Sequence, residues 1–90
     1  MEKPEPHWWL YVLECTGGLL YTGVSPDVQA RFQKHAAGHG AFFTKLNPPL
    51  RVLGAKPVGT QSEALKAEYA FKKLPVQEKR QQAMAWSRDS

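Results

Sequence analysis

Two apolar segments joined by a glycine-containing turn constrain the fold of this 90-residue sequence more than any other feature. Trp8–Glu14 and Leu19–Val24 are rich in aromatic and branched side chains, which favour strands. Between them, Thr16-Gly17-Gly18 supplies positions that tolerate a positive φ. The pattern therefore predicts a β-hairpin.

A helix is expected directly after the hairpin. In Ser25-Pro26-Asp27, serine is the expected N-cap, proline suits the first helical position and aspartate favours the positive end of the helix dipole. We expect this helix to run from Pro26 to about Ala37, where Gly38 and Gly40 end it.

The second half of the chain predicts one strand and two further helices. Asn47-Pro48-Pro49 interrupts regular structure before a strand over Leu50–Val58, which Gly54 weakens or bulges. Thr60-Gln61-Ser62-Glu63 fits a capping box and opens a helix that runs to about Leu74. After Pro75, a polar helix is expected over Gln77–Trp86. Ala83 and Trp86 of this helix, together with Val76 just before it, are expected to pack back on the fold.

This order of elements predicts an α+β fold with a small, mainly antiparallel three-stranded sheet flanked by helices. Residues 1–6 are proline-rich and charged, so we expect a flexible leader. Residues 7–86 then form one domain, and residues 87–90 form a C-terminal tail. The length suits a single modest core, and 42% hydrophobic residues suffice to form it.

Charge and cysteine content narrow the classes of function. A formal net charge of +4 favours a polyanionic partner, although a solvated basic surface that aids solubility carries the same excess. Cys15 is the only cysteine, which excludes an internal disulfide and a zinc site of several thiolates. The longest apolar run, Trp8–Leu13, is too short for a membrane helix, and the N-terminus does not resemble a signal peptide. We therefore expect a cytoplasmic protein without a membrane partner.

Three groups of residues are candidates for chemistry, and each has a purely structural alternative. Tyr11 and Tyr21 lie in neighbouring predicted strands, although tyrosine is also a favoured strand residue. Arg31 and His35, four residues apart, can meet one phosphate, or they belong to a solvated helix face. Glu68 lies inside the apolar arc of its helix, where it either holds a hard cation or pairs with the lysine at position 72.

In their order and spacing, these residues resemble the GIY-YIG nuclease family, specifically its small standalone bacterial type. The resemblance covers about three quarters of the chain and rests on six segments. They are Trp9-Leu10-Tyr11, Tyr21-Thr22-Gly23, the helix Asp27–His35, the glycine-bounded loop Gly38–Thr44, the strand Leu50–Leu53 and the helical Ala67-Glu68-Tyr69. The first motif lacks the glycine and isoleucine of the family. The asparagine that many members carry after the glutamate has no counterpart here, because Asn47 is the only asparagine.

The resemblance implies hydrolysis of a DNA phosphodiester with one Mg²⁺ or Mn²⁺ ion. Tyr21 would take a proton from the attacking water and Tyr11 would help to orient that water. Arg31 would hold the scissile phosphate, Glu68 would bind the metal, and His35 would support Tyr21 or the water. The expected activity is a structure-selective endonuclease of DNA repair or recombination, acting on branched, nicked or single-stranded DNA.

Four basic residues outside the implied catalytic site are expected to follow the DNA backbone: Lys34, Lys45, Arg51 and Lys56. The adjacent Phe42 and Phe43 either stack on bases or cover the core. Two other functions stay open. One is a catalytically silent DNA-binding module with the same fold, which the missing asparagine favours. The other is an interaction domain that recruits a protein through its former nuclease site.

Overall fold

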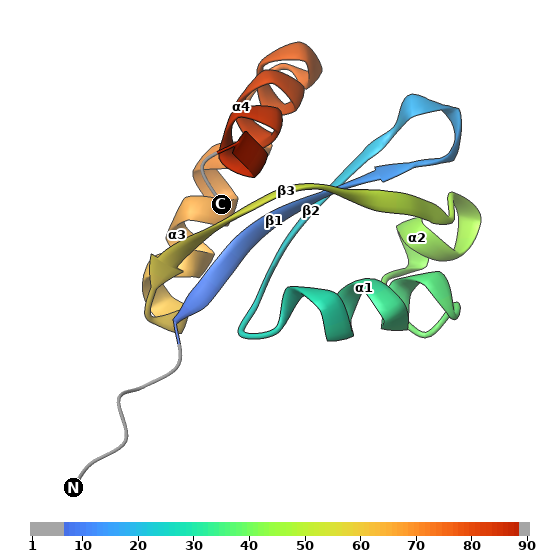
Figure 1. Ribbon diagram of the computed structural model, residues 1–90, viewed down its shortest axis with the longest axis horizontal. Coiled ribbons are helices and arrows are strands. Elements are labelled where there is room, and N and C mark those ends of the chain that lie inside the picture. The colour runs from blue at the N-terminus through green and yellow to red at the C-terminus, as the bar shows by residue number, and fades with distance from the viewer. Residues whose placement is uncertain (1–6, 89–90) are drawn as a thin grey trace, which may run out of the picture.

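The computed structural model describes residues 7–88 and shows one antiparallel sheet with helices against both faces (Figure 1). Its strands are β1 (Trp8–Cys15), β2 (Leu20–Ser25) and β3 (Pro49–Gly59). They lie in the order β2-β1-β3, and β1 pairs antiparallel with both neighbours. The predicted α+β fold with a three-stranded antiparallel sheet is therefore confirmed.

The central strand β1 is apolar because both of its faces are buried. Leu10 and Val12 pack into one core, while Tyr11 and Leu13 point to the opposite face and pack into a second core. A strand covered on both faces needs a continuous apolar run rather than an alternating pattern. This requirement explains the sequence of β1.

The hairpin between β1 and β2 closes through the short 3₁₀ turn η1 (Thr16–Gly18). Gly17 and Gly18 have φ angles of 75° and 76°, in the left-handed region that glycine adopts without strain. The predicted hairpin and its glycine-dependent turn are both present.

Helix α1 (Val28–Ala36) begins two residues later than predicted. Asp27, not Ser25, is its N-cap, because the Asp27 side chain accepts a hydrogen bond of 3.0 Å from the amide of Ala30. The Ser25 side chain is buried at the end of β2 and exchanges hydrogen bonds with the backbone of Asp27. The prediction of Ser25 as the N-cap was therefore wrong.

A short helix, α2 (Phe42–Leu46), lies where the sequence indicated a glycine-bounded loop. Strand β3 follows at Pro49, one residue before its predicted start. Its register with β1 shifts next to Gly54, which agrees with the irregularity expected there. A Cβ atom on Gly54 would collide with the carbonyl of Ala83, so this glycine lets the last helix approach the sheet.

Helices α3 (Gln61–Lys72) and α4 (Val76–Arg88) complete the fold. Both hydrogen bonds of the predicted capping box are present at the start of α3. Ala83 and Trp86 pack back onto the core as expected, whereas Val76 is exposed and does not. Helix α4 also includes residues 87 and 88 of the expected tail; residues 89–90 and the expected leader 1–6 lie outside the described residues.

The helices divide between the two faces of the sheet. Helix α1 contributes Val28 and Phe32 to the core around Tyr11, whereas α3 and α4 contribute to the core around Leu10 and Val12. Figure 1 shows α1 and α4 on opposite sides of the strands. Among the described helices, none has the length and apolar character that a membrane span requires.

Candidate active site

Tyr11 lies at the centre of the candidate site. Its side chain is 2% exposed and projects from β1 toward the face that α1 covers. Gly23 is its register partner on β2, and a Cβ atom on Gly23 would overlap the Tyr11 hydroxyl and ring. Gly23, the last residue of the Tyr21-Thr22-Gly23 motif, therefore makes room for the side chain of Tyr11, in addition to any role at the end of β2.

His35 joins α1 to Tyr11. Its side chain is buried rather than part of the solvated face that carries Lys34. Nε2 lies 3.1 Å from the Tyr11 hydroxyl, and Nδ1 lies 2.8 Å from the hydroxyl of Thr44 on α2. The histidine is thus held at both ring nitrogens.

Tyr21 completes an aromatic cluster around this histidine. Its ring centroid is 4.9 Å from that of His35 and 5.9 Å from that of Phe43. Because Tyr21 is half-buried and Tyr11 is buried, Tyr21 is the more accessible of the two phenols. The hairpin therefore brings both predicted tyrosines to one histidine.

Three other predicted catalytic residues influence the electrostatics of Tyr11. Burial is the main cause that raises the pKa of Tyr11 above its usual value, and the neighbouring Tyr21 adds to the rise. The charge of Arg31 lowers this pKa, while the charge of Glu68 raises it. Burial, followed by the charge of Arg31, also lowers the pKa of His35 below its usual value. Residues from the neighbouring strand β2 and from two helices therefore act on the Tyr11 hydroxyl, which His35 also contacts.

Arg31 lies on α1, and its side chain is exposed to solvent. Together with Lys34, Asp27 and Ser25 it lines a surface depression of about 250 Å³. A larger depression of about 320 Å³ lies nearby, is mainly apolar and contains none of the predicted catalytic residues. The depression beside Arg31 presents two cationic side chains and one carboxylate, that of Asp27, so its charge suits a phosphate better than the apolar depression does.

Of the two alternatives that the sequence left open for Glu68, the structure shows the pair with Lys72, and metal binding stays a prediction. The Glu68 carboxylate is 3.3 Å from the ammonium group of Lys72, one turn further along α3. The same carboxylate lies close enough to Tyr11 to raise its pKa. Glu68 is thus paired with a lysine and is also part of the electrostatic surroundings of the tyrosine.

A metal ion at Glu68 would have few protein ligands. Among the described residues, no group of three or more histidine, cysteine, aspartate or glutamate side chains converges to hold a metal. A single carboxylate fits Mg²⁺, which commonly takes one or two carboxylates and completes its octahedron with water and phosphate oxygens. It does not fit a closed zinc site.

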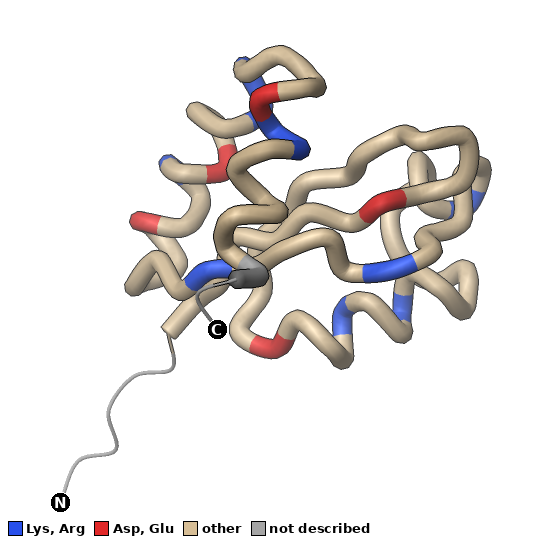
Figure 2. Tube along the Cα trace, turned by 45° about the horizontal axis from the view of Figure 1, so that its top comes forward, with Lys and Arg blue, Asp and Glu red and all other residues tan. Residues whose placement is uncertain are grey.

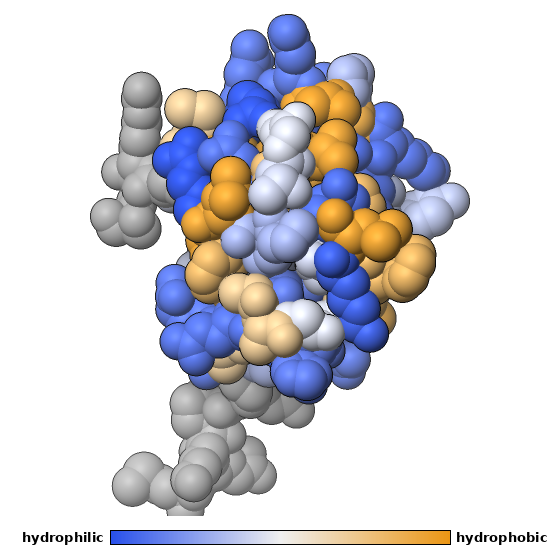
Figure 3. All heavy atoms as spheres, turned by 90° about the vertical axis from the view of Figure 1, so that its right-hand side faces the viewer, coloured by the Kyte–Doolittle hydropathy of each residue, from blue (hydrophilic) through white to orange (hydrophobic). Residues whose placement is uncertain are grey.

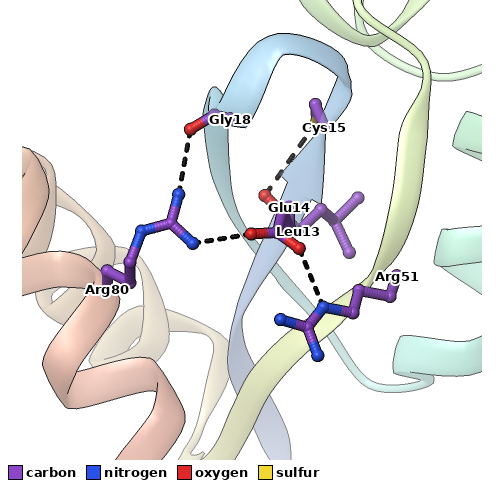
Figure 4. Close-up of polar contacts among 6 residues, drawn as sticks. All are labelled: Leu13, Glu14, Cys15, Gly18, Arg51 and Arg80. Atoms are coloured by element: carbon purple, nitrogen blue, oxygen red, sulfur yellow. Dashed lines mark hydrogen bonds and ion pairs between the residues drawn. The ribbon is translucent and has the colours of Figure 1, made fainter.

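The four predicted DNA-contacting residues divide between the two faces of the sheet. Lys34 on α1 and Lys45 on α2 are exposed on the side of Tyr11. Arg51 instead pairs with Glu14, which also binds Arg80 of α4 (Figure 4). Lys56 lies over the Trp86 ring of α4, with its Nζ 5.0 Å from the ring centroid. Basic positions accordingly occur on α1 and also beside α3 and α4 (Figure 2).

The two adjacent phenylalanines of α2 differ in their surroundings. Phe43 packs on Tyr21, whereas Phe42 is 72% exposed. The end of the molecule that carries α2 and the hairpin turn shows several apolar patches separated by polar residues (Figure 3). Phe42 therefore remains available for stacking, and Phe43 belongs to the aromatic cluster.

The sequence did not single out two residues that contact His35. Thr44 is 1% exposed, and its hydroxyl lies against Nδ1. Gly40 is also close, because a Cβ atom there would collide with the same nitrogen. A glycine followed four residues later by a threonine carries no signal of a histidine contact, so only the tertiary structure reveals these roles.

Comparison with known proteins gives consistent results. The family model described as the GIY-YIG catalytic domain matches residues 7–81. A UPF0213 protein of Cupriavidus pinatubonensis is 52% identical over 75 residues, which cover 83% of this chain and 83% of the relative. The solution NMR structure of EF2693 from E. faecalis shares 38% identity with a TM-score of 0.56, and covers 90% of this chain and 85% of that chain. The solution NMR structure of the UPF0213 protein BH0048 from Bacillus halodurans shares 37% identity with a TM-score of 0.51, and covers 83% of this chain and 80% of that chain.

Proposed function

Because the chain belongs to the GIY-YIG catalytic domain family, we propose that it is a metal-dependent DNA endonuclease. The observation that carries the proposal is the arrangement around the Tyr11 hydroxyl. His35 contacts that hydroxyl, and Tyr21, Arg31 and Glu68 all influence its pKa. Selection by DNA structure rather than by sequence is the proposed specificity, as in repair or recombination.

In the proposed reaction, Tyr21 acts as a phenolate and accepts a proton from a water molecule. The water oxygen forms a bond to phosphorus while the bond from phosphorus to the 3′ oxygen breaks, and the departing 3′ oxygen takes up a proton from solvent. Arg31 binds the phosphate and offsets the negative charge that grows on its oxygens. Tyr11 orients the water, and His35 holds Tyr11 in place through their 3.1 Å contact.

Glu68 is the residue that would hold a single Mg²⁺ or Mn²⁺ ion. When bound, such an ion polarises the phosphate and stabilises the departing oxygen. Glu68 must then exchange its contact with Lys72 for the cation, or share the carboxylate between them. The role of Lys72 is to neutralise this half-buried carboxylate before the ion binds.

The decisive experiment is cleavage of branched, nicked and single-stranded DNA by purified protein in Mg²⁺ or Mn²⁺. Tyr21→Phe, Arg31→Ala and Glu68→Ala are each expected to abolish cleavage. Tyr69→Phe is the matched control, because Tyr69 is exposed on the same helix and lies against Lys73. If wild type and all three variants cleave alike, the activity is a contaminant and the proposal fails.

A catalytically silent DNA-binding module is the second candidate. Two observations favour it: Glu68 is already paired with Lys72, and the asparagine found after the glutamate in many family members has no counterpart here. DNA binding by the wild type without cleavage in either metal, on any of the three substrates, would select this alternative.

A further inference from the structure

The hydrogen-bonding partners of His35 determine which ring nitrogen carries the proton. A neutral imidazole has one N–H donor and one bare acceptor nitrogen. Among the residues that the structure describes, the partner of Nε2 is the Tyr11 hydroxyl, at 3.1 Å. Nδ1 has two partners, the Thr44 hydroxyl at 2.8 Å and the backbone amide of Ala41 at 3.3 Å.

The amide of Ala41 is the partner that cannot adapt. A hydroxyl hydrogen rotates to suit its neighbours, whereas the position of an amide hydrogen is fixed by the backbone and can only be donated. Within the described residues, His35 Nδ1 is the acceptor that this amide reaches. Because this partly buried amide can only donate, its contact with Nδ1 favours a bare Nδ1 and a proton on Nε2.

Thr44 is compatible with this assignment. Its hydroxyl is 2.8 Å from the carbonyl of Ala41 as well as 2.8 Å from Nδ1, so its hydrogen can go to either. The carbonyl already accepts from the amides of Thr44 and Lys45, at 3.0 and 3.2 Å. The hydroxyl hydrogen is therefore available to Nδ1 without leaving that carbonyl unpaired.

Gly40 supplies an independent reason to regard this contact as specific. A Cβ atom at position 40 would collide with Nδ1, so only glycine allows the backbone at positions 40 and 41 to approach the edge of the imidazole. The φ of Gly40 is not in the left-handed region, so backbone conformation does not require the glycine. Its small size is the requirement.

We propose that the Ala41 amide and the Thr44 hydroxyl hold neutral His35 as its Nε2–H tautomer, so that His35 donates to Tyr11 and the Tyr11 hydrogen is directed to the reacting groups. Thr44 is then a positioning residue, because it acts on the reaction through His35 and Tyr11. Burial keeps the pKa of Tyr11 high, so the hydroxyl retains its hydrogen at neutral pH. The role in catalysis rests on the proposed nuclease function, whereas the tautomer does not.

The tautomer can be measured directly by NMR on uniformly ¹⁵N-labelled wild-type protein at pH 7. Long-range proton–nitrogen correlations distinguish a protonated ring nitrogen from a bare one, and His35→Gln identifies the His35 signals among those of the exposed His7 and His39. We expect a protonated Nε2 and a bare Nδ1. A protonated Nδ1, alone or together with Nε2, would overturn the proposal.

Thr44→Val and Thr44→Ser test the positioning role. Thr44→Val removes the hydroxyl with little change in volume, and we expect kcat to fall about fivefold, the usual effect of losing one hydrogen bond. KM for DNA should stay unchanged, because the buried Thr44 does not reach substrate. Thr44→Ser should restore kcat, and amide spectra of each variant report whether it is folded.

The outcomes separate the two proposals. Unchanged kcat in a folded Thr44→Val variant overturns the positioning role, as does a serine variant that fails to restore it. A wild type that cleaves no DNA contradicts the proposed function, yet its His35 tautomer is still measured. Should Thr44→Val fail to fold, the wild-type tautomer alone decides.

Discussion

The Tyr11 hydroxyl occupies space beside β2 that any side chain larger than hydrogen at Gly23 would fill. The two residues are register partners on adjacent strands, and both lie on the face covered by α1. The position of the phenol in the candidate site therefore depends on the glycine of the neighbouring strand.

Gly23→Ala is expected to displace the Tyr11 ring and to destabilise the fold by about 1–3 kcal/mol, the usual cost of overpacking a core. Because a misplacement of ~1 Å at an active site costs on the order of 100-fold in rate, cleavage should fall further than the loss of stability explains. Urea denaturation measures the loss of stability. Cleavage kinetics, at a temperature where the variant is folded, measure the loss of rate.

A double-mutant cycle with Tyr11→Phe supplies the control. The hydroxyl is the atom that a Cβ at position 23 would approach most closely, so its removal should relieve part of the cost of Gly23→Ala. Additive stability changes would show that the two residues do not interact in this way.

Patterns in the sequence within single elements predicted much of this architecture. The turn glycines, the Thr60–Glu63 capping box and the apolar run of β1 all act within one element or between adjacent ones, so local sequence reveals them. The choice of Asp27 over Ser25 as N-cap was not predictable in the same way. Both residue types can cap a helix, and the burial of Ser25 against the sheet decides between them.

The partners of the candidate site depend on contacts between distant segments. His35 meets Tyr11 across 24 residues, and Arg51 meets Glu14 across 37. The sequence therefore identified Arg51 as a basic residue, but it gave no sign that the carboxylate of Glu14 forms an ion pair with it. Helix α2 escaped prediction for a related reason, because its five residues are too few for helical periodicity to be recognised.

Lys72 is expected to compete with the metal for Glu68. Lys72→Gln removes the cation 3.3 Å from the carboxylate, so Mn²⁺ affinity measured by calorimetry should rise severalfold. Lys73→Gln removes the same charge from the adjacent position, where the ammonium group lies 4.2 Å from the Tyr69 ring centroid. Equal effects of the two substitutions would show that general charge, and not the pair with Glu68, sets the affinity.

DNA affinity is expected to depend on the basic residues of α1 far more than on those beside α4. Lys34→Gln should weaken binding and reduce the slope of log K against log salt by about one unit, as the loss of one phosphate contact does. Lys56→Gln removes the same charge from a lysine that lies over Trp86, and should leave the slope unchanged. Fluorescence anisotropy over a salt series measures both, and equal slopes for the two variants would contradict the assignment of the DNA-binding face.

Glu14 is expected to make the attachment of α4 sensitive to acid. Its carboxylate accepts 2.6 and 2.8 Å hydrogen bonds from Arg80 and Arg51, and Arg80 also reaches the carbonyl of Gly18 in the hairpin turn. The contact with Arg80, followed by that with Arg51, lowers the pKa of Glu14 below its usual value. The folded state thus favours the ionised carboxylate.

The sign of the pH dependence follows from that shift. Stability from Glu14 is fully present above the pKa of the unfolded chain and is lost as pH falls through the lower pKa of the folded state. Urea unfolding from pH 7 down to pH 3 should therefore show a steeper loss of stability for the wild type than for Glu14→Gln, which has no proton to bind. Glu78→Gln, in the exposed first turn of α4, is the control and should keep the wild-type slope.

Arg80→Gln should flatten the curve of stability against pH more than Arg51→Gln, because Arg80 makes the larger contribution to the pKa shift of Glu14. Parallel curves for the wild type and Glu14→Gln would show that ionisation of Glu14 contributes nothing to the pH dependence of stability.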